Sequence, residues 1–113
     1  MNQNQAEQFL AKMHELVRNG KRYFVRRTRH GVSYIQQLAD LGLTSVDEAW
    51  EIVLKLNGTH RVSGPEFDRN DPECGKVVWV FKMEVNGLIT YIKLKDEELK
   101  RGCVCLSFHE DDL

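Results

Sequence analysis

The sequence predicts an α+β domain in which N-terminal helices pack on a small antiparallel β-sheet. Three observations favour this fold class. Apolar residues in the first half of the chain recur at helical spacing, whereas residues 76–109 alternate apolar and polar side chains as strands do. In addition, Asn86-Gly87 separates two β-rich runs, and this pair is the strongest short signal for a hairpin because both residues tolerate the positive φ of a type I′ turn.

With 113 residues, of which 42% are hydrophobic and 29% charged, the chain has the size and composition of one soluble globular domain. We expect residues 1–25 to form a helix and a connector, and residues 26–113 to form the core. No apolar run approaches the ~20 residues that span a bilayer, and the first residues lack the features of a signal peptide. Three cysteines, an odd number, favour reduced thiols in the cytoplasm over a disulfide scaffold.

Three helices are predicted from apolar spacing and from the residues that begin or end them. Residues 5–19 and 32–41 each form an amphipathic pattern that a glycine closes. A third helix is expected to run from an N-cap at Thr44 to about Leu56. Residues 23–25, between the first two helices, could form a short strand or an extended connector.

Residues 57–75 hold both prolines and three of the eight glycines of the chain. This composition predicts a long loop that could contain a short strand at 60–63. Loops of this length in compact domains are usually functional or disordered.

The two-residue turn at Asn86-Gly87 fixes the register of the strands on either side of it. The pairs expected on one face are Val85 with Leu88, Met83 with Thr90, Phe81 with Ile92 and Trp79 with Leu94. This largely apolar face must be the buried one. The pairs expected on the opposite face are Lys82 with Tyr91 and Val80 with Lys93, with Lys95 next along.

The last strand, CVCLSFH, alternates in the same way. Val104, Leu106 and Phe108 are expected to point inward. The side chains left on the other face are Cys103, Cys105, Ser107 and His109. If this strand joins the sheet, Tyr91 and His109 share one polar surface with the lysines of the hairpin.

The net charge of −1 conceals a segregation of charge along the chain. Six basic residues and no acidic one occur in one segment: Arg18, Lys21, Arg22, Arg26, Arg27 and Arg29. The C-terminus, in contrast, contains Glu110-Asp111-Asp112. This pattern indicates an anionic partner such as phosphate, or a partner protein of complementary charge, or else a basic loop that is merely solvated.

Metal and cysteine chemistry are weakly indicated. At ~3.4 Å per strand residue, Cys103 and His109 lie about 20 Å apart, too far to share one metal ion. Cys105 and His109, roughly 13 Å apart on the same basis, are too distant for a thiolate pair. The chain also has no glycine motif that binds phosphates or dinucleotides. We therefore expect no metal and no cofactor.

The surface of Tyr91, Lys93 and His109 fits metal-free cleavage of RNA better. In that reaction the 2′-hydroxyl attacks the adjacent phosphate, so the protein must supply a base, an acid and cations. His109 can act as acid or base near neutral pH, and Tyr91 can donate a hydrogen bond or a proton. Lysines and arginines can bind phosphate, and aromatic faces can stack on bases. The simpler alternative is that His109 only ends a surface strand and Tyr91 only covers the sheet.

Four segments carry a likeness to a known family: LADLGLTSVDEAWEIVLKL, GPEFDRNDP, VVWVFKMEVNGLITYIKLK and CLSFHE. In this order they resemble the motility quorum-sensing regulator (MqsR) toxins of bacterial toxin–antitoxin pairs, which have a RelE-like fold. The resemblance covers roughly residues 26–110, the toxin-like core. It implies a small, sequence-selective endoribonuclease that cleaves messenger RNA, restrains growth and is neutralised by a cognate antitoxin protein.

The resemblance also implies a set of site residues. Tyr91 matches a catalytic tyrosine, and His109 stands where the best-known member has a lysine. A second lysine would fall near Ser63, so Arg61 is the closest basic residue here, and Val80 replaces a glutamine. We therefore expect Tyr91, His109, Lys93 and Arg61 to act in catalysis, and Lys82, Arg26, Arg27, Arg29 and Lys95 to bind RNA.

Two other classes of function compete with this hypothesis. The chain could bind RNA or the ribosome without cutting, in which case it would protect RNA and lose affinity steeply with salt. Alternatively, it could be a protein-interaction module in which the basic segment and the acidic tail dock a partner. Failure to bind RNA at moderate salt would favour the second alternative.

Overall fold

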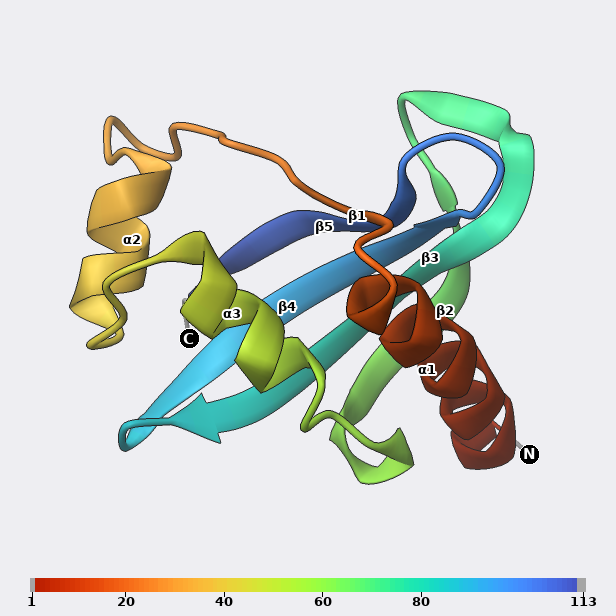
Figure 1. The fold of residues 1–113 in the computed structure, drawn as a ribbon, viewed down its shortest axis with the longest axis horizontal. Helices are drawn as coiled ribbons and strands as arrows, with labels where there is room; N and C mark the ends of the chain where they lie inside the picture. Colours follow the sequence, from red (N-terminus) through yellow and green to blue (C-terminus); the bar gives the residue numbers. More distant parts are fainter. Residues whose placement is uncertain (1, 112–113) are drawn as a thin grey trace.

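The computed structural model describes residues 2–111, and within them three α-helices accompany a five-stranded β-sheet (Figure 1). The helices are α1 (Asn2–Arg18), α2 (Tyr34–Asp40) and α3 (Val46–Val53), followed by the 3-10 turn η1 (Gly58–His60). The strands are β1 (Arg22–Phe24), β2 (Arg61–Asp68), β3 (Asp71–Val85), β4 (Leu88–Glu97) and β5 (Gly102–Glu110). This architecture confirms the predicted α+β class. None of the helices in residues 2–111 is both long and apolar enough to cross a membrane.

The sheet is mixed rather than purely antiparallel. Its strand order is β1-β5-β4-β3-β2. The edge strand β1 runs parallel to β5, with Tyr23 opposite Val104, whereas the other neighbours are antiparallel. The close approach of β1 requires Gly102, which has a φ of +82° and where any side chain would overlap the backbone of Lys21.

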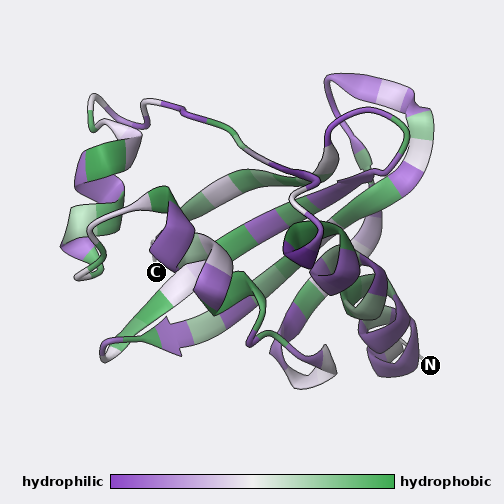
Figure 2. Cartoon of the chain, in the orientation of Figure 1, coloured by the Kyte–Doolittle hydropathy of each residue, from purple (hydrophilic) through white to green (hydrophobic). Residues whose placement is uncertain are grey.

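Helices α1 and α3 both lie on the near side of the sheet in Figure 1 and cover its apolar face. Phe9 of α1 stacks on Trp79, with ring centroids 5.4 Å apart, and Trp50 of α3 meets Phe24 edge-on. Each large apolar side chain buried in this way stabilises the fold by roughly 1.5–3 kcal/mol. Figure 2 shows apolar and polar bands along the strands, as a sheet with one buried and one polar face requires.

The predicted helices are present, but their ends differ by a few residues. α2 begins after Ser33, whose hydroxyl accepts a hydrogen bond from the Gln36 amide. α3 has Ser45 as its N-cap, not Thr44 as expected. The hydroxyl of Thr44 instead donates to the Glu48 carboxylate at 2.8 Å. This helix ends at Val53, three residues before the predicted end.

The register predicted for the hairpin at Asn86-Gly87 is confirmed for every pair from Trp79 with Leu94 to Val85 with Leu88. Asn86 has a φ of +51° and Gly87 a φ of +84°, as a type I′ turn requires. The Asn86 side-chain amide also donates to the carbonyl of Leu41 at 2.8 Å. This hydrogen bond ties the turn to the segment that follows α2.

The prediction of a long loop over residues 57–75 is wrong. Residues 61–68 form β2, and a tight turn at Arg69-Asn70 leads into β3. Register shifts at four places bend this hairpin. Its proline and glycine content reflects an irregular strand at the edge of the sheet, where a residue without an N–H, such as Pro65, is tolerated.

One extra residue in β5 changes which of its side chains point to the core and which to the polar face. Lys93 pairs with Ser107, but the adjacent Leu94 pairs with Cys105, so Leu106 forms a β-bulge. Because side chains alternate along a strand, one inserted residue reverses the faces on one side of it.

The prediction therefore holds only after the bulge. Phe108 is in the core, and His109 lies on the polar face. Before the bulge the prediction is wrong: Cys103 and Cys105 are buried free thiols of the core, and Val104 takes the opposite face. Burial raises the pKa of Cys103 to about 12, which keeps this thiol protonated.

Candidate functional site

Tyr91 and His109 lie face to face on the side of the sheet away from α1 and α3. They are paired across β4 and β5, and their rings stack with centroids 5.1 Å apart and 11° between the planes. The shared surface was predicted from side-chain alternation. The stacking itself was not, because alternation fixes a face but not the rotamers on it.

The hydrogen bonding of His109 determines which of its ring nitrogens can accept a proton. The side chain is only 7% exposed, and Nδ1 lies 2.8 Å from the carbonyl oxygen of Glu110. A carbonyl oxygen can only accept, so this contact assigns the hydrogen to Nδ1. In the neutral ring Nε2 is then an acceptor and can act as a base.

Tyr91, in contrast, carries a proton that it can donate. Burial raises the pKa of its hydroxyl, and the carboxylate of Glu66 adds to this shift, although the nearby positive charge of Lys82 opposes it. The hydroxyl therefore stays protonated at neutral pH. The stacked pair thus combines a group that can take a proton with one that can donate a proton.

Lys82 of β3 lies on the same face, directly opposite Tyr91 of β4, as predicted. Its Nζ is 2.9 Å from Oδ2 of Asp111, so part of the acidic C-terminal segment folds back onto it. An RNA phosphate would have to compete with this carboxylate for Lys82.

A hollow of about 510 Å³ opens beside Tyr91. Lys93 lines it, as does Arg27 from the segment after β1, while Arg69 and Asn70 line it from the β2–β3 turn. Three of these four side chains are cationic. Sequence reasoning missed Arg69 and Asn70 because their segment was assigned to a loop of unknown path. A hairpin prediction for residues 61–85 would have identified them.

The three arginines expected to bind RNA do not lie together. Arg27 lines the hollow beside Tyr91, and Arg29 lines a smaller one of about 170 Å³ beside His109. The guanidinium carbon of Arg26 lies 5.9 Å from the ring centroid of Tyr34. Arg27 and Arg29 thus adjoin the stacked pair from two sides, whereas Arg26 packs on α2.

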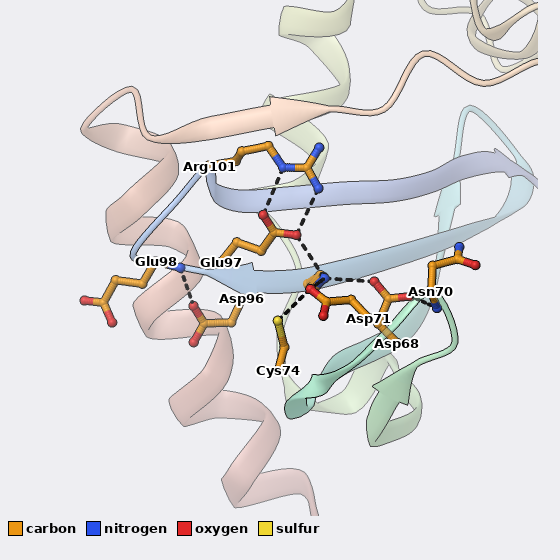
Figure 3. A network of polar contacts seen from close by, with 9 residues as sticks. Asp68, Asn70, Asp71, Cys74, Asp96, Glu97, Glu98 and Arg101 are labelled. Carbon is orange, nitrogen blue, oxygen red and sulfur yellow. Dashed lines mark hydrogen bonds and ion pairs between the residues drawn. The ribbon is translucent and has the colours of Figure 1, made fainter.

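Lys95 is not on the open surface where we expected it to bind RNA. It is 2% exposed, and its Nζ lies 2.8 Å from Asp68, 2.9 Å from Glu97 and 3.5 Å from Asp71. Burial disfavours the charged ammonium, but the carboxylates of Asp68 and Glu97 outweigh it, so the pKa of Lys95 is raised. Figure 3 shows these carboxylates converging from the β2–β3 turn and from the end of β4.

Arg61 is likewise not brought to the stacked pair. Its Nη2 donates to the carbonyl of Gly64 at 3.0 Å, and its guanidinium carbon lies 5.9 Å from the Trp79 ring centroid. Trp79 belongs to the core under α1. Arg61 therefore lies on the face of the sheet opposite Tyr91.

Within residues 2–111, no three or more His, Cys, Asp or Glu side chains are grouped so that they could hold a metal ion. The carboxylates of the polar face instead surround Lys95, and Glu97 also accepts two hydrogen bonds of 2.9 Å from Arg101.

We compared the chain with known protein families, with curated proteins and with solved structures, and none of the three comparisons found a match. The likeness to MqsR toxins therefore remains an expectation from the sequence.

Proposed function

We propose that this protein is a metal-independent endoribonuclease that cleaves messenger RNA through the RNA's own 2′-hydroxyl. The stacked pair supports this proposal most strongly, because Tyr91 brings a hydroxyl that can donate a proton, and His109 a ring nitrogen that can accept one, to the same surface. These are the acid and the base that the reaction requires.

In the proposed reaction, Nε2 of His109 takes the proton of the 2′-hydroxyl. The resulting oxygen attacks the adjacent phosphorus, and the bond from phosphorus to the 5′-oxygen breaks. Tyr91 gives its proton to the departing 5′-oxygen, and a proton then passes from His109 through solvent to restore Tyr91. The products are a 2′,3′-cyclic phosphate and a 5′-hydroxyl end.

Cations beside Tyr91 supply the remaining requirement. The extra negative charge on phosphorus in the transition state is stabilised by positive groups placed in advance. Lys93, Arg27 and Arg69 line the hollow at Tyr91, and Arg29 adjoins His109. Lys95 and Arg61 have no part in this mechanism.

We further propose that the protein is the toxin of a toxin–antitoxin pair, that it acts in the cytoplasm and that a cognate antitoxin protein neutralises it. The toxin role and the antitoxin are supported only by the sequence resemblance over roughly residues 26–110, and the cytoplasm by the three cysteines, which favour reduced thiols.

The test is incubation of purified protein with single-stranded RNA in excess chelator, comparing the wild type with His109→Phe. Phenylalanine keeps an aromatic ring stacked on Tyr91 but cannot move a proton. We expect cleavage by the wild type and a loss of about 10²–10⁴-fold in the variant.

Loss of all cleavage in chelator would contradict the metal-free mechanism, and a fully active His109→Phe protein would exclude His109 as the base. RNA that is bound and protected but never cut would favour the non-catalytic alternative.

A further inference from the structure

We propose that the RNA site continues along the sheet as a groove that binds the single-stranded segment downstream of the cut, with Lys100 as its distal phosphate contact. This inference rests on the proposed function and extends it. A second hollow of about 470 Å³ lies next to the one at Tyr91. Both are lined by Arg27, Asp68, Asn70 and Leu106, so they form one continuous groove.

The charges lining this groove favour a polyanion. Four of its cations make no ion pair within residues 2–111: Arg27, Arg69 and Lys93 beside Tyr91, and Lys100 at the far end. Its carboxylates, in contrast, are engaged. Asp68 and Glu97 bind Lys95, Glu97 also binds Arg101, and Asp71 lies near Lys95 and accepts a hydrogen bond from Cys74. The charge left to face solvent is therefore positive.

The bulge in β5 provides an apolar floor for the groove. A regular strand would bury Leu106 in the core, but the extra residue turns it toward the polar face, where it lines both hollows. An apolar side chain between cations suits a ribose or a base whose phosphates lie on either side. The bulge thus has a consequence for binding as well as for register.

The wall of the groove is held in place by the buried network. Figure 3 shows Asp68 and Asn70 at the β2–β3 turn, next to the carboxylates that surround Lys95. Lys95 fastens this turn to β4 through Asp68, at 2.8 Å. Arg69 and Asn70 are therefore presented to a ligand by a fixed turn rather than by a loose loop.

The position of Tyr91 sets the direction of the bound strand. Tyr91 lines the first of the two hollows, whereas His109 lines neither of them. Since Tyr91 is proposed to protonate the departing 5′-oxygen, the nucleotide that carries this oxygen lies in the first hollow. From Tyr91 to Lys95 the strand extends ~14 Å, which is longer than one nucleotide, so the next nucleotide downstream reaches the second hollow.

The test compares two oligonucleotides that share one cleavable ribonucleotide and differ only in having one or three nucleotides downstream of it. Affinity is measured on versions with a 2′-deoxy nucleotide at the cut, which cannot be cleaved. We expect the longer one to bind the wild type more tightly. In Lys100→Ala the difference in affinity between the two should shrink, and the slope of log affinity against log salt should fall by about 0.7 for the longer one.

Lys55→Ala is the matched control, because Lys55 is an exposed lysine two residues after α3, the helix that covers the other face of the sheet. It should bind both oligonucleotides as the wild type does. Equal affinity of the wild type for both lengths, or a Lys100→Ala protein with an unchanged difference, would overturn the groove while leaving the proposed cleavage intact. A third oligonucleotide is lengthened upstream of the cut instead. If it binds the wild type more tightly and Lys100→Ala removes this gain in affinity, the proposed direction of the strand is wrong. Because the binding measurement needs no cleavage, failure of the proposed function would be seen separately.

Discussion

At the scale of single residues, the chemistry of the site depends on where two hydrogens lie. The carbonyl of Glu110 holds one on Nδ1 of His109, and burial keeps the other on the hydroxyl of Tyr91. Stacking holds the two rings against each other on one surface. A change that keeps the rings but removes a transferable proton therefore separates chemistry from stability.

Tyr91→Phe is such a change. We expect cleavage to slow by about 10²-fold or more, because the leaving oxygen loses its proton donor. The free energy of unfolding should change by less than about 1 kcal/mol, since the stacked ring remains. Single-turnover cleavage and urea denaturation measure the two effects.

Tyr23→Phe is the control, because it alters a tyrosine on the edge strand β1, and it should cleave RNA at the wild-type rate. If Tyr91→Phe cleaves as fast as this control, Tyr91 is excluded as the acid.

Lys95→Met tests the buried network. Methionine fills a similar volume but leaves the partly buried Asp68 without its cation and the buried Glu97 with Arg101 alone, which we expect to cost about 3–5 kcal/mol in the free energy of unfolding. Lys12→Met is the control, because Lys12 also pairs with two carboxylates at 2.8 Å but its side chain is 43% exposed. Its loss should be about 0–1 kcal/mol. Similar losses in the two variants would show that burial does not strengthen the network.

At the scale of secondary-structure elements, the sequence predicts best those elements whose pairing allows few alternatives. The turn at Asn86-Gly87 allows one register, and so it placed Tyr91 on the polar face. The bulge at Leu106 was not predictable, because an apolar residue in an alternating strand gives no sign that it is extra. The hairpin of β2 and β3 was hidden by its prolines and glycines. For that reason the sequence did not show that Asp68 and Asp71 are partners of Lys95. It also did not show that this lysine is buried.

The junction of β1 with β5 should depend on Gly102. In Gly102→Ala the new methyl group would overlap the carbonyl of Lys21, whereas in Gly75→Ala it would meet nothing within 4 Å. Both glycines have a φ near +82°, so the backbone strain of about 1–2 kcal/mol is common to the pair. We expect Gly102→Ala to be clearly the less stable protein in urea denaturation. Equal losses would show that β1 moves away at no cost.

At the scale of the whole molecule, one face of the sheet is sealed by α1 and α3, and the other carries both the site and the ionised network around Lys95. The ionised network makes the free energy of unfolding depend on pH. Hydrogen bonds from Arg101 and Lys95 lower the pKa of Glu97 from 4.5 to about 2, although burial opposes the shift. The pKa of Asp68 is lowered as well, chiefly by Lys95.

Folding stability should therefore fall in acid. A carboxylate whose pKa is lower in the folded protein contributes its stability above the unfolded value, near 4.5, and loses it as the pH falls toward 2. We expect the urea midpoint to be level between about pH 6 and 8 and to drop below about pH 4.5. In Lys95→Met this acid drop should be smaller, because Asp68 loses its bound cation and Glu97 keeps only Arg101. An equally steep drop in that variant would assign the acid sensitivity to other groups.

The proposed role of Tyr91 and His109 requires cleavage by the RNA's own 2′-hydroxyl, and the chemical ends that the wild-type protein leaves on RNA test this most directly. We predict a 2′,3′-cyclic phosphate on one fragment and a 5′-hydroxyl on the other, and no cut where the nucleotide before the scissile phosphate is 2′-deoxy. Fragments that carry a 3′-hydroxyl and a 5′-phosphate, or a cut at the 2′-deoxy position, would contradict the role given to Tyr91 and His109.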